Sequence, residues 1–448
     1  MTDFAGRRLH MVGIGGAGMS ALAAVAYAWG ADVDGCDRVV SEYARRLRRF
    51  GVEVAAGHDP AHLNAGIEVV VSSALPDEAE ELVEARARGL KVLHRAELLA
   101  EMVAARRSVC VAGAHGKTTT TAMIAYAAAQ LGLDPTWLVG GDVPQLGGNA
   151  GPGGGELLIA EADESDGTCA LLRPQVALVT NIELDHHARF ASQEELRALF
   201  AGWAAAVPAD GAVLLGDGID LDAAAPRAWF GFDARADWRV TGFEHARGGS
   251  TFWLRVPGAP PVRVELRLPG AHNARNAAGA VAALAAVGAS AADAAAALRG
   301  FEGAGRRFER RGSVAGATLV DDYAHHPTEV AAAIDAARAQ APARVLVCFQ
   351  PHLYSRTAAL AGEFGAALAG ADEAVVTEIY PAREAPLEGV TSKLVVDAIA
   401  ERRPGMPLAY EPTLEAAADY LRARIRAGDL VLTVGAGDVR RVGDMLLG

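Results

Sequence analysis

The chain is short of the features that mark secreted, membrane-embedded and disulfide-stabilised proteins. It has only four cysteines in 448 residues, far apart and with no Cys-x-x-Cys pair, so the sequence suggests neither a disulfide framework nor a zinc site. No apolar run approaches the roughly 20 residues that a membrane span needs. No cleavage-like segment follows the basic N-terminus either. We therefore expect a cytoplasmic protein without membrane insertion.

Basic residues are also in deficit. The 42 lysines and arginines are outnumbered by 55 aspartates and glutamates, which gives a formal net charge of -13. Because nucleic-acid binding is dominated by basic surfaces, we expect no nucleic-acid partner, and any bound phosphate must be held locally. With 51% hydrophobic residues, 22% charged residues and 50 glycines, the composition is that of a globular protein rich in βα turns.

Short apolar runs that alternate with helical patterns predict an α/β protein of three domains. Strands are expected at 9–14, 31–35, 68–72 and 91–93, at 108–112, 157–160, 176–180 and 212–215, and at 318–320, 344–349, 373–377 and 430–434. Between about 226 and 268 the pattern changes to alternating residues, as at 251–256 and 262–268, and predicts antiparallel strands at the flank of the central domain. We expect a Rossmann-like domain over 1–102, a central P-loop-type α/β domain with a flanking antiparallel sheet over 103–304, and a Rossmann-like C-terminal domain over 305–448.

The segment 109–121 predicts a nucleoside triphosphate site. An apolar strand leads into a glycine turn, a lysine and a helix that begins near Thr118. Gly113 and Gly116 let backbone amides approach phosphate oxygens, Lys117 supplies a point charge, and the helix start favours an anion. The Thr118 hydroxyl is placed to ligate magnesium. The turn is shorter than the usual eight-residue phosphate loop.

Acidic residues follow the next two strands of the same domain. Residues 161–166 read Glu-Ala-Asp-Glu-Ser-Asp, and residues 181–187 read Asn-Ile-Glu-Leu-Asp-His-His. Ligands of open parallel sheets bind at the carboxyl ends of strands, and a hard cation needs oxygen ligands. We therefore expect a cation site beside the phosphate loop. A solvated acidic loop or a helix N-cap is the alternative for 161–166.

A second glycine turn, Gly13-Ile-Gly-Gly-Ala-Gly18, follows the first strand of the chain, and Asp37 lies near the end of the second. This is the dinucleotide fingerprint, in which the acid can meet a ribose. It also suits any other diphosphate nucleotide, and the alternative is a turn that only packs strand on helix. The second nucleotide loop at 113–118 makes a redox role less natural.

Three further segments carry polar residues at the ends of elements. His272, Asn273 and Asn276 lie at the start of an alanine-rich helix, which Asn273 could also merely cap. Residues 321–328 and 349–357 each end a strand of the third domain, and Pro327 suits a first helical turn. We expect these last two loops to face a common cleft.

Taken in order, these segments resemble the Mur ligases over essentially the whole chain. The resemblance rests on 15–19, 114–121, 161–166, 180–186, 272–276, 321–329 and 354–357. It implies an ATP- and Mg²⁺-dependent enzyme of peptidoglycan synthesis that joins L-alanine to UDP-N-acetylmuramate through an acyl phosphate. The N-terminal domain would bind the UDP part, the central domain ATP and magnesium, and the C-terminal domain the amino acid. A monomer or homodimer is expected.

The resemblance also implies roles for individual residues. The UDP part would be bound by Gly13, Gly15, Gly16, Ala17, Gly18, Met19, Asp37, Ser72 and Ser73. ATP would be bound by Gly113, His115, Gly116, Lys117, Thr118, Thr119, His272, Asn273, Asn276 and Arg307. Magnesium would be held by Thr118, Glu161 and His186, and the catalytic set would be Lys117, His186, Arg307, Asp322, His325 and Arg356.

The sequence departs from the family pattern at three places. Leu353 stands where arginine is frequent, and unusual residues follow His186 and Ala150. The segment 187–210 contains no lysine, so we do not predict the carbamylated lysine of other Mur ligases.

Three other functions stay open. They are a ligase of the same family that attaches a recycled tripeptide, an NAD-dependent oxidoreductase that uses the first glycine turn, and a non-catalytic sensor of UDP-sugars. The segment 15–19 favours the alanine enzyme over the first. The second leaves Lys117 and the acidic strand ends unexplained, and the intact phosphate and metal positions argue against the third.

Overall fold

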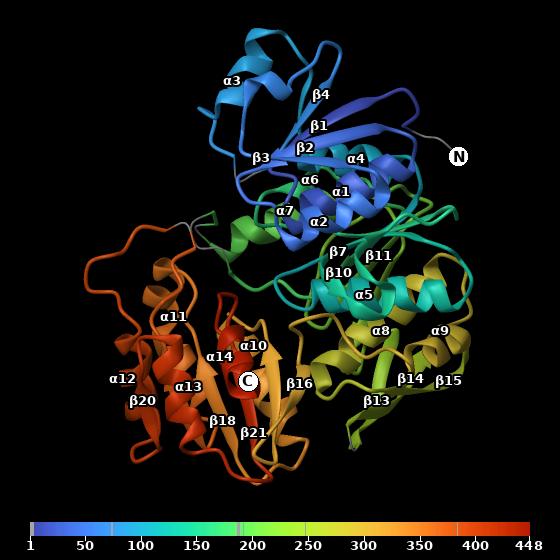
Figure 1. Ribbon diagram of the computed structural model, residues 1–448. Coiled ribbons are helices and arrows are strands. Elements are labelled where there is room, and N and C mark those ends of the chain that lie inside the picture. Colours follow the sequence, from blue (N-terminus) through green and yellow to red (C-terminus); the bar gives the residue numbers. More distant parts are fainter. Residues whose placement is uncertain (1–3, 73–74, 186–188, 191, 247, 383) are drawn as a thin grey trace.

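The computed structural model describes residues 4–72, 75–185, 189–190, 192–246, 248–382 and 384–448, and each of its three domains is built on one β-sheet (Figure 1). The N-terminal sheet is parallel, with the order β3-β2-β1-β4-β5. Its strand order reverses between β1 and β4, where ligands of open parallel sheets bind. The strands are β1 (Arg8–Val12), β2 (Asp32–Asp37), β3 (Glu53–Ala56), β4 (Glu68–Val71) and β5 (Val92–His94). The helices are α1 (Ala17–Ala28), α2 (Glu42–Leu47), η1 (Arg48–Phe50), η2 (Pro60–His62), α3 (Glu80–Ala87) and α4 (Arg95–Ala104).

The central domain contains a ten-stranded sheet in the order β15-β14-β13-β12-β11-β10-β6-β9-β7-β8. The strands from β12 to β7 in this order are parallel. Strand β6, which leads into the phosphate loop, lies between β10 and β9. The strands are β6 (Arg107–Ala112), β7 (Thr136–Val143), β8 (Gly148–Gly151), β9 (Leu157–Glu161), β10 (Val176–Val179), β11 (Ala212–Gly216), β12 (Arg227–Gly231), β13 (Trp238–Ala246), β14 (Gly249–Val256) and β15 (Ala259–Leu266). The helices are α5 (Lys117–Gln130), η3 (Pro144–Leu146), α6 (Thr168–Leu171), α7 (Gln193–Ala205), α8 (Ala271–Ala286) and α9 (Ala291–Leu298).

The C-terminal sheet has the order β16-β17-β21-β18-β19-β20, in which only the β16–β17 pair is antiparallel. The strands are β16 (Glu309–Val314), β17 (Ala317–Asp322), β18 (Val345–Phe349), β19 (Glu373–Val376), β20 (Leu408–Tyr410) and β21 (Leu430–Val434). The helices are α10 (Pro327–Arg338), α11 (Tyr354–Leu368), α12 (Lys393–Arg402), α13 (Leu414–Arg422) and α14 (Arg440–Leu447). The loops after β17 and β18 therefore leave the same edge of one sheet.

The predicted α/β class and the three domains are confirmed, and several details of the prediction are corrected. The helix of the phosphate loop begins at Lys117, as the expected start near Thr118 requires, and Gly116 precedes it with a left-handed φ of 82°. Of the segment expected to be antiparallel, β13–β15 are, but β12 pairs in parallel with both β11 and β13 and so continues the central sheet. Strands β3, β7, β8, β16 and β20 were not predicted. None of the described helices is long and apolar enough to span a membrane.

The first two domains share a buried core, whereas the third has its own. One apolar cluster extends from α1 and the first sheet into the central domain, and it includes Leu22, Met102, Leu138 and Trp203. The two clusters of the C-terminal domain contain no buried residue from before Ala317. The domain boundaries at 102 and 304 stay predictions, but the described core separates only the third domain.

Candidate functional site

The phosphate-loop segment forms a tight turn between β6 and α5. The side chains that follow β10 hold it in place, because Thr180 Oγ1 donates to the carbonyl of His115 at 2.6 Å and Asn181 Nδ2 donates to the same oxygen at 2.7 Å. Gly113 has a φ of 126°, and a Cβ there would collide with Thr180. Gly116 is likewise left-handed, and its Cβ would meet Asn276. Both glycines are therefore required by the turn.

Two acidic side chains, one at the end of β9 and one just after it, reach this turn. Thr118 Oγ1 donates to Glu161 Oε1 at 3.2 Å, and the other Glu161 oxygen accepts from the Gly140 amide at 2.8 Å. Lys117 Nζ donates to Glu164 Oε1 at 2.9 Å and to the Gly113 carbonyl at 2.6 Å. The convergence predicted from the sequence is thus present for Thr118 and Glu161, while His186 lies outside the described residues.

The Lys117 amine is held charged at the start of α5. Burial favours its neutral form, but the attraction of Glu164, Asp163 and Glu161 outweighs burial and raises its pKa well above the usual range. A permanent ammonium group beside exposed helix amides is a suitable partner for phosphate oxygens.

The three polar residues at the start of α8 face the phosphate loop. Burial lowers the pKa of His272 to about 4, so its ring is neutral near pH 7. Asn273 Nδ2 donates to the Pro269 carbonyl at 2.8 Å, and Gly270, not Asn273, occupies the N-cap position. The alternative role of Asn273 as the helix cap is therefore wrong. These neutral groups are suited to the polar edge of an uncharged base.

A cavity of about 210 Å³ lies where the central and C-terminal domains meet. Seven of the ten residues predicted to bind ATP line it, together with Asp322 and Glu183. Those seven are His115, Gly116, Thr119, His272, Asn273, Asn276 and Arg307. The predicted residues Gly113, Lys117 and Thr118 lie in or next to the same turn, outside the cavity lining.

The C-terminal domain contributes Arg307 and Asp322 to this cavity. Asp322 accepts from the amides of Phe308 and Ala324 at 2.7 and 2.8 Å. Burial raises its pKa to about 6, although Arg307 opposes the shift. The two residues that flank Arg307, Arg306 and Phe308, have left-handed φ values of 58° and 52°. Non-glycine residues in this conformation are strained, and such strain gathers at functional sites.

The other two predicted catalytic residues of this domain contact the loop after β10. Arg356 is almost fully buried and donates to Asp185 Oδ1 through two nitrogens, at 2.9 and 2.7 Å. His325 Nε2 lies 3.7 Å from the other oxygen of Asp185. Leu353, which replaces a frequent arginine of the family, caps α11 with a left-handed φ of 71°. The residues after β17 and β18 therefore both reach Asp185 of the central domain.

The first glycine turn lies at the switch point of the N-terminal sheet. The Gly15 amide donates to Asp37 Oδ2 at 2.8 Å, so the predicted turn and acid are in contact. A Cβ on Gly13 would press on Ser72, and one on Gly18 would collide with Arg95. Gly16 precedes α1, whose first residues include Ala17, Gly18 and the buried Met19. Ser73 lies outside the described residues.

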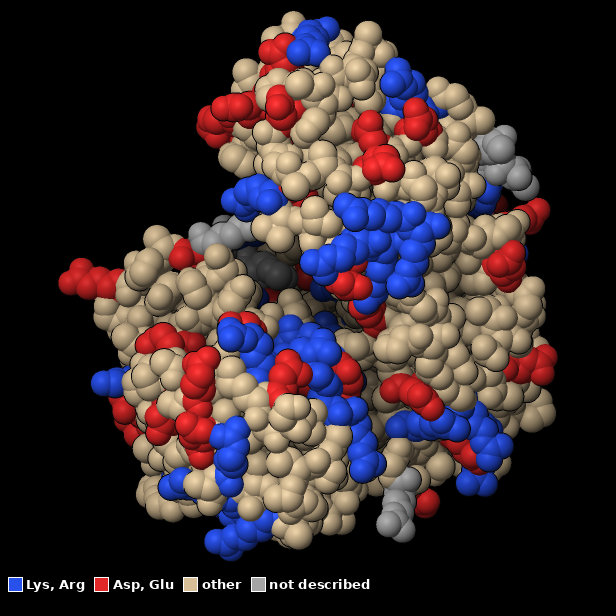
Figure 2. Space-filling view, viewed as in Figure 1, with Lys and Arg blue, Asp and Glu red and all other residues tan. Residues whose placement is uncertain are grey.

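Figure 2 shows a hollow between the N-terminal and C-terminal lobes, with blue residues on its borders. The basic group in the middle of this view lies over α2 and η1, whose sequence includes Arg45, Arg46, Arg48 and Arg49. A protein of net charge -13 thus concentrates positive charge beside this hollow.

Several site residues were absent from the set predicted from the sequence. Glu164 holds Lys117, and Asp185 holds Arg356. Asn149 of β8 donates to the Ala17 carbonyl at 2.7 Å and so links the central domain to the first glycine turn. Glu164 and Asp185 lie within segments that were singled out for other residues, and only the fold shows which partner each has.

Magnesium ligands can be judged from the donors present. The Thr118 hydroxyl and the Glu161 carboxylate are oxygen donors already in contact beside the lysine, which is the donor type that magnesium prefers. These two residues therefore fit a magnesium ion.

The histidine of the phosphate loop forms a charged contact between domains. His115 Nε2 lies 3.1 Å from Glu183, and its Nδ1 lies 3.2 Å from Glu329 of α10. Burial opposes charging of His115, but the two carboxylates raise its pKa to about 9. The hydrogen bond from His115 lowers the pKa of Glu183 to about 2.

This pair predicts how stability depends on pH. His115 stabilises the fold fully below its usual pKa of 6.5, and the gain, roughly 3 kcal/mol, is lost as the pH rises through 9. Glu183 stabilises the fold above 4.5, and its gain is lost as the pH falls toward 2. Unfolding free energies from urea titrations should therefore decline above pH 6.5. In His115→Gln the decline should be smaller but not abolished, because the pKa of His10 is also raised to about 9. Equal slopes in both proteins would contradict this assignment.

Comparisons with known proteins cover nearly the whole chain. Family models described as "Mur ligase family, catalytic domain", "Mur ligase middle domain" and "Mur ligase, glutamate ligase domain" match residues 8–107, 111–284 and 306–437. A UDP-N-acetylmuramate–L-alanine ligase of Acidothermus cellulolyticus is 45% identical, over 96% of this chain and 92% of its own. The crystal structure of a UDP-N-acetylmuramate–alanine ligase of Thermotoga maritima has a TM-score of 0.83 at 27% identity, covering 98% of both chains. A murein peptide ligase of Psychrobacter arcticus shares the fold, with a TM-score of 0.70 at 23% identity over 99% of this chain and 98% of its own.

Proposed function

This chain belongs to the Mur ligase family, and we propose that it joins L-alanine to the carboxylate of UDP-N-acetylmuramate with hydrolysis of ATP to ADP and phosphate. The product is a precursor of peptidoglycan. The similarity of this chain to the alanine ligases spans nearly the full length of the compared chains, which supports the choice of substrates. The use of ATP is consistent with a cytoplasmic enzyme, and we expect a monomer or homodimer.

The observation that carries this proposal is the cavity between the central and C-terminal domains. It brings the phosphate loop, the neutral groups of α8, and Arg307 and Asp322 of the third domain to one place. A base-binding edge, a phosphate-binding turn and charged groups from a second domain are the parts that ATP-dependent acyl activation requires.

The reaction would proceed in two steps. A carboxylate oxygen of the muramate forms a bond to the γ-phosphorus, the bond to the β-phosphate oxygen breaks, and ADP leaves. The amine of L-alanine then attacks the acyl carbon and phosphate leaves, while the amine loses a proton. Lys117 neutralises charge that develops on the phosphoryl group, and closure of the third domain positions the two reactants.

We propose that Thr118, Glu161 and His186 hold the magnesium ion. When bound, magnesium neutralises phosphate charge and fixes the orientation of the triphosphate. The contact of Thr118 with Glu161 supports this set, and Gly140 keeps the carboxylate aimed at the loop through its amide. We propose further that the first glycine turn, with Asp37, binds the UDP part of the substrate.

The assay that tests the function measures phosphate release from ATP with Mg²⁺ and UDP-N-acetylmuramate. We expect release to depend on L-alanine, with glycine and L-serine as weaker substrates, and to require UDP-N-acetylmuramate. The ligated product is identified by mass spectrometry. Release that depends on the tripeptide alone would assign the protein to the recycling reaction instead. Reduction of NAD without phosphate release would reject both ligase functions.

A further inference from the structure

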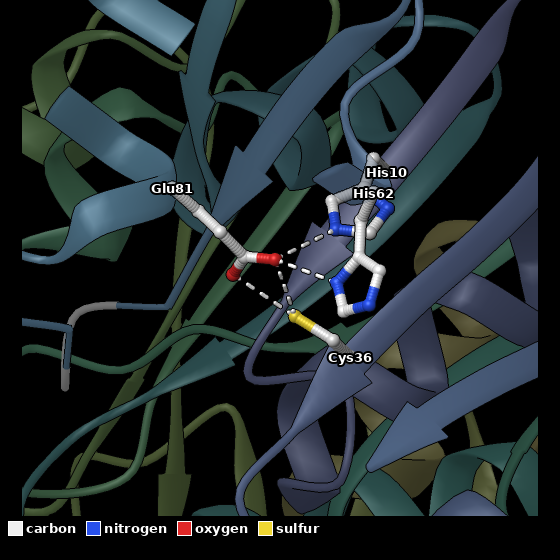
Figure 3. Close-up of side chains that lie close together, drawn as sticks. All are labelled: His10, Cys36, His62 and Glu81. Carbon is white, nitrogen blue, oxygen red and sulfur yellow. Dashed lines mark hydrogen bonds and ion pairs between the residues drawn. The ribbon is translucent and has the colours of Figure 1, made fainter. Parts of the chain in front are cut away.

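A second group of chemically reactive side chains lies in the N-terminal domain, and none of its members lines the ATP cavity. His10 comes from β1, Cys36 from β2, His62 from η2 and Glu81 from the first turn of α3. Figure 3 shows the four side chains pointing toward one another. One ligand atom from each lies within 4.8 Å of all the others. The phosphate and magnesium residues described above are not part of this group.

The separations between these atoms are close to those of a tetrahedral metal site. Cys36 Sγ lies 3.2 and 3.0 Å from the two Glu81 oxygens, His62 Nδ1 lies 2.9 Å from Oε1, and His10 Nε2 lies 3.6 Å from Oε1. Zinc bonds of about 2.0 to 2.3 Å place ligand atoms about 3.3 to 3.8 Å apart. Small side-chain movements would therefore bring the four atoms around one ion.

The carboxylate of Asp34, which lies outside the group of four, orients the ring of His10. His10 is 2% exposed, and its Nδ1 lies 2.6 Å from Asp34 Oδ1. When Nδ1 donates to Asp34 and Nε2 carries no proton, the lone pair of Nε2 points toward Glu81. This buried Nε2 lies 3.6 Å from Glu81 Oε1, just beyond hydrogen-bond distance. A histidine that ligates a metal through one nitrogen while a carboxylate holds the other is the usual arrangement.

The charges also suit a divalent ion. Glu81 is fully buried, and its carboxylate oxygens lie 2.9 to 3.2 Å from the ligand atoms of Cys36 and His62. A thiolate, a carboxylate and a doubly charged cation sum to zero, which removes the cost of an isolated charge in the interior. His58, whose Nδ1 lies 3.2 Å from Cys36 Sγ and 3.1 Å from Glu81, would become an outer partner or replace a ligand.

We propose that His10, Cys36, His62 and Glu81 form a binding site for a divalent transition metal, with Zn²⁺ the ion that best matches one sulfur, two imidazole and one carboxylate ligand. Binding releases the thiol proton of Cys36 and any proton on His10 to solvent. The site was not predicted from the sequence because its ligands come from four separate elements and not from a Cys-x-x-Cys pair.

The site would stabilise the nucleotide-binding end of the first sheet. The carbonyl of Cys36 accepts from the amides of Gly13 and Ile14 at 2.8 and 3.1 Å, and Asp37 is the next residue. A metal that joins β1, β2, η2 and α3 would therefore restrain the glycine turn from behind. It would act structurally and requires neither ATP nor UDP-N-acetylmuramate.

Cobalt provides a direct test, because Co²⁺ bound to a thiolate gives a near-ultraviolet charge-transfer absorption that imidazole and carboxylate sites lack. Metal-free full-length protein without a histidine tag is titrated with Co²⁺ in the absence of nucleotides. We expect the band to saturate at one Co²⁺ per chain and to be displaced by Zn²⁺. Absence of the band in the folded protein would overturn the proposal and leave a hydrogen-bonded network that holds protons only.

Two variants and a control locate the metal. Cys36→Ser should abolish the band, whereas Cys348→Ser, a change at another buried cysteine, should retain it. Asp34→Asn changes only the outer partner and should weaken Co²⁺ affinity roughly 10- to 100-fold. Circular dichroism checks that each variant is folded. If Cys36→Ser does not fold, the Asp34→Asn titration decides, and an unchanged affinity there counts against the site. A band that persists in folded Cys36→Ser likewise rejects it.

Discussion

Lys117→Ala is expected to lower kcat for phosphate release by at least roughly 10³-fold, because a fixed cation on the transferred phosphoryl group is worth that much or more. The structure adds a second effect. Glu164 is almost fully buried and loses its lysine countercharge, and breaking a buried pair costs about 3 to 5 kcal/mol. The fold of this variant is therefore retained but less stable. Steady-state phosphate release and urea unfolding measure the two losses.

A second substitution separates these effects. In Lys117→Ala combined with Glu164→Gln the buried carboxylate is gone, so stability should recover while turnover does not. Lys393→Ala is the matched control, because Lys393 is an exposed lysine at the start of α12. Its activity should equal that of the wild type. Turnover near the wild-type rate in Lys117→Ala would reject the phosphate role of the lysine.

Arg356→Met is expected to lower kcat/KM by at least about 100-fold, since the two bonds from Arg356 to Asp185 join the C-terminal domain to the central one. Without the guanidinium, Asp185 is a buried carboxylate between two domains. If the domains separate, water reaches the Asp185 carboxylate. The loss of the Arg356–Asp185 contact should therefore show as a larger radius of gyration in small-angle X-ray scattering, and only partly as a lower free energy of unfolding.

The double variant Arg356→Met, Asp185→Asn distinguishes positioning from catalysis. Removal of both charges should restore the compact form. If activity returns with it, Arg356 acts by holding the domains together, and if activity stays low, Arg356 also contacts the reacting groups. Arg344→Ala is the control, because its partner Asp429 lies in the same domain. It should lower stability without changing the radius, and an unchanged radius in Arg356→Met would contradict the closure role.

The parts of the fold that could be predicted are those with a strong local signal. The apolar strands at 109–112 and 345–349 are fully buried between helices, and such strands read as continuous hydrophobic runs. Strand β8 has the sequence Gly-Asn-Ala-Gly, and β16 begins with Glu-Arg-Arg, so neither has a local β signal. They are strands because β7 and β17 offer them hydrogen bonds, which only the assembled sheet provides.

The candidate site shows the same division. Thr118 and Glu161 could be paired from the sequence because the carboxyl ends of neighbouring parallel strands meet at one edge. The pairing of Asp185 with Arg356 spans 171 positions and two domains, and no periodicity reveals it. The cluster around Glu81 was missed for a similar reason, since a buried acid in a helix looks like any surface glutamate until its partners on three other elements are known.

The unequal division of the core affects how such a chain can change by recombination. A crossover near residue 103 would combine a foreign α1 with β7 and β8, and each side chain of the shared apolar cluster would have to match a new neighbour. A crossover near residue 305 would leave intact the core shared by the first two domains and the separate core of the third. It would need to preserve only a few polar pairs between domains, such as Thr328 with Glu183 and Arg356 with Asp185. The C-terminal domain is therefore the part of this architecture that recombination could exchange most easily.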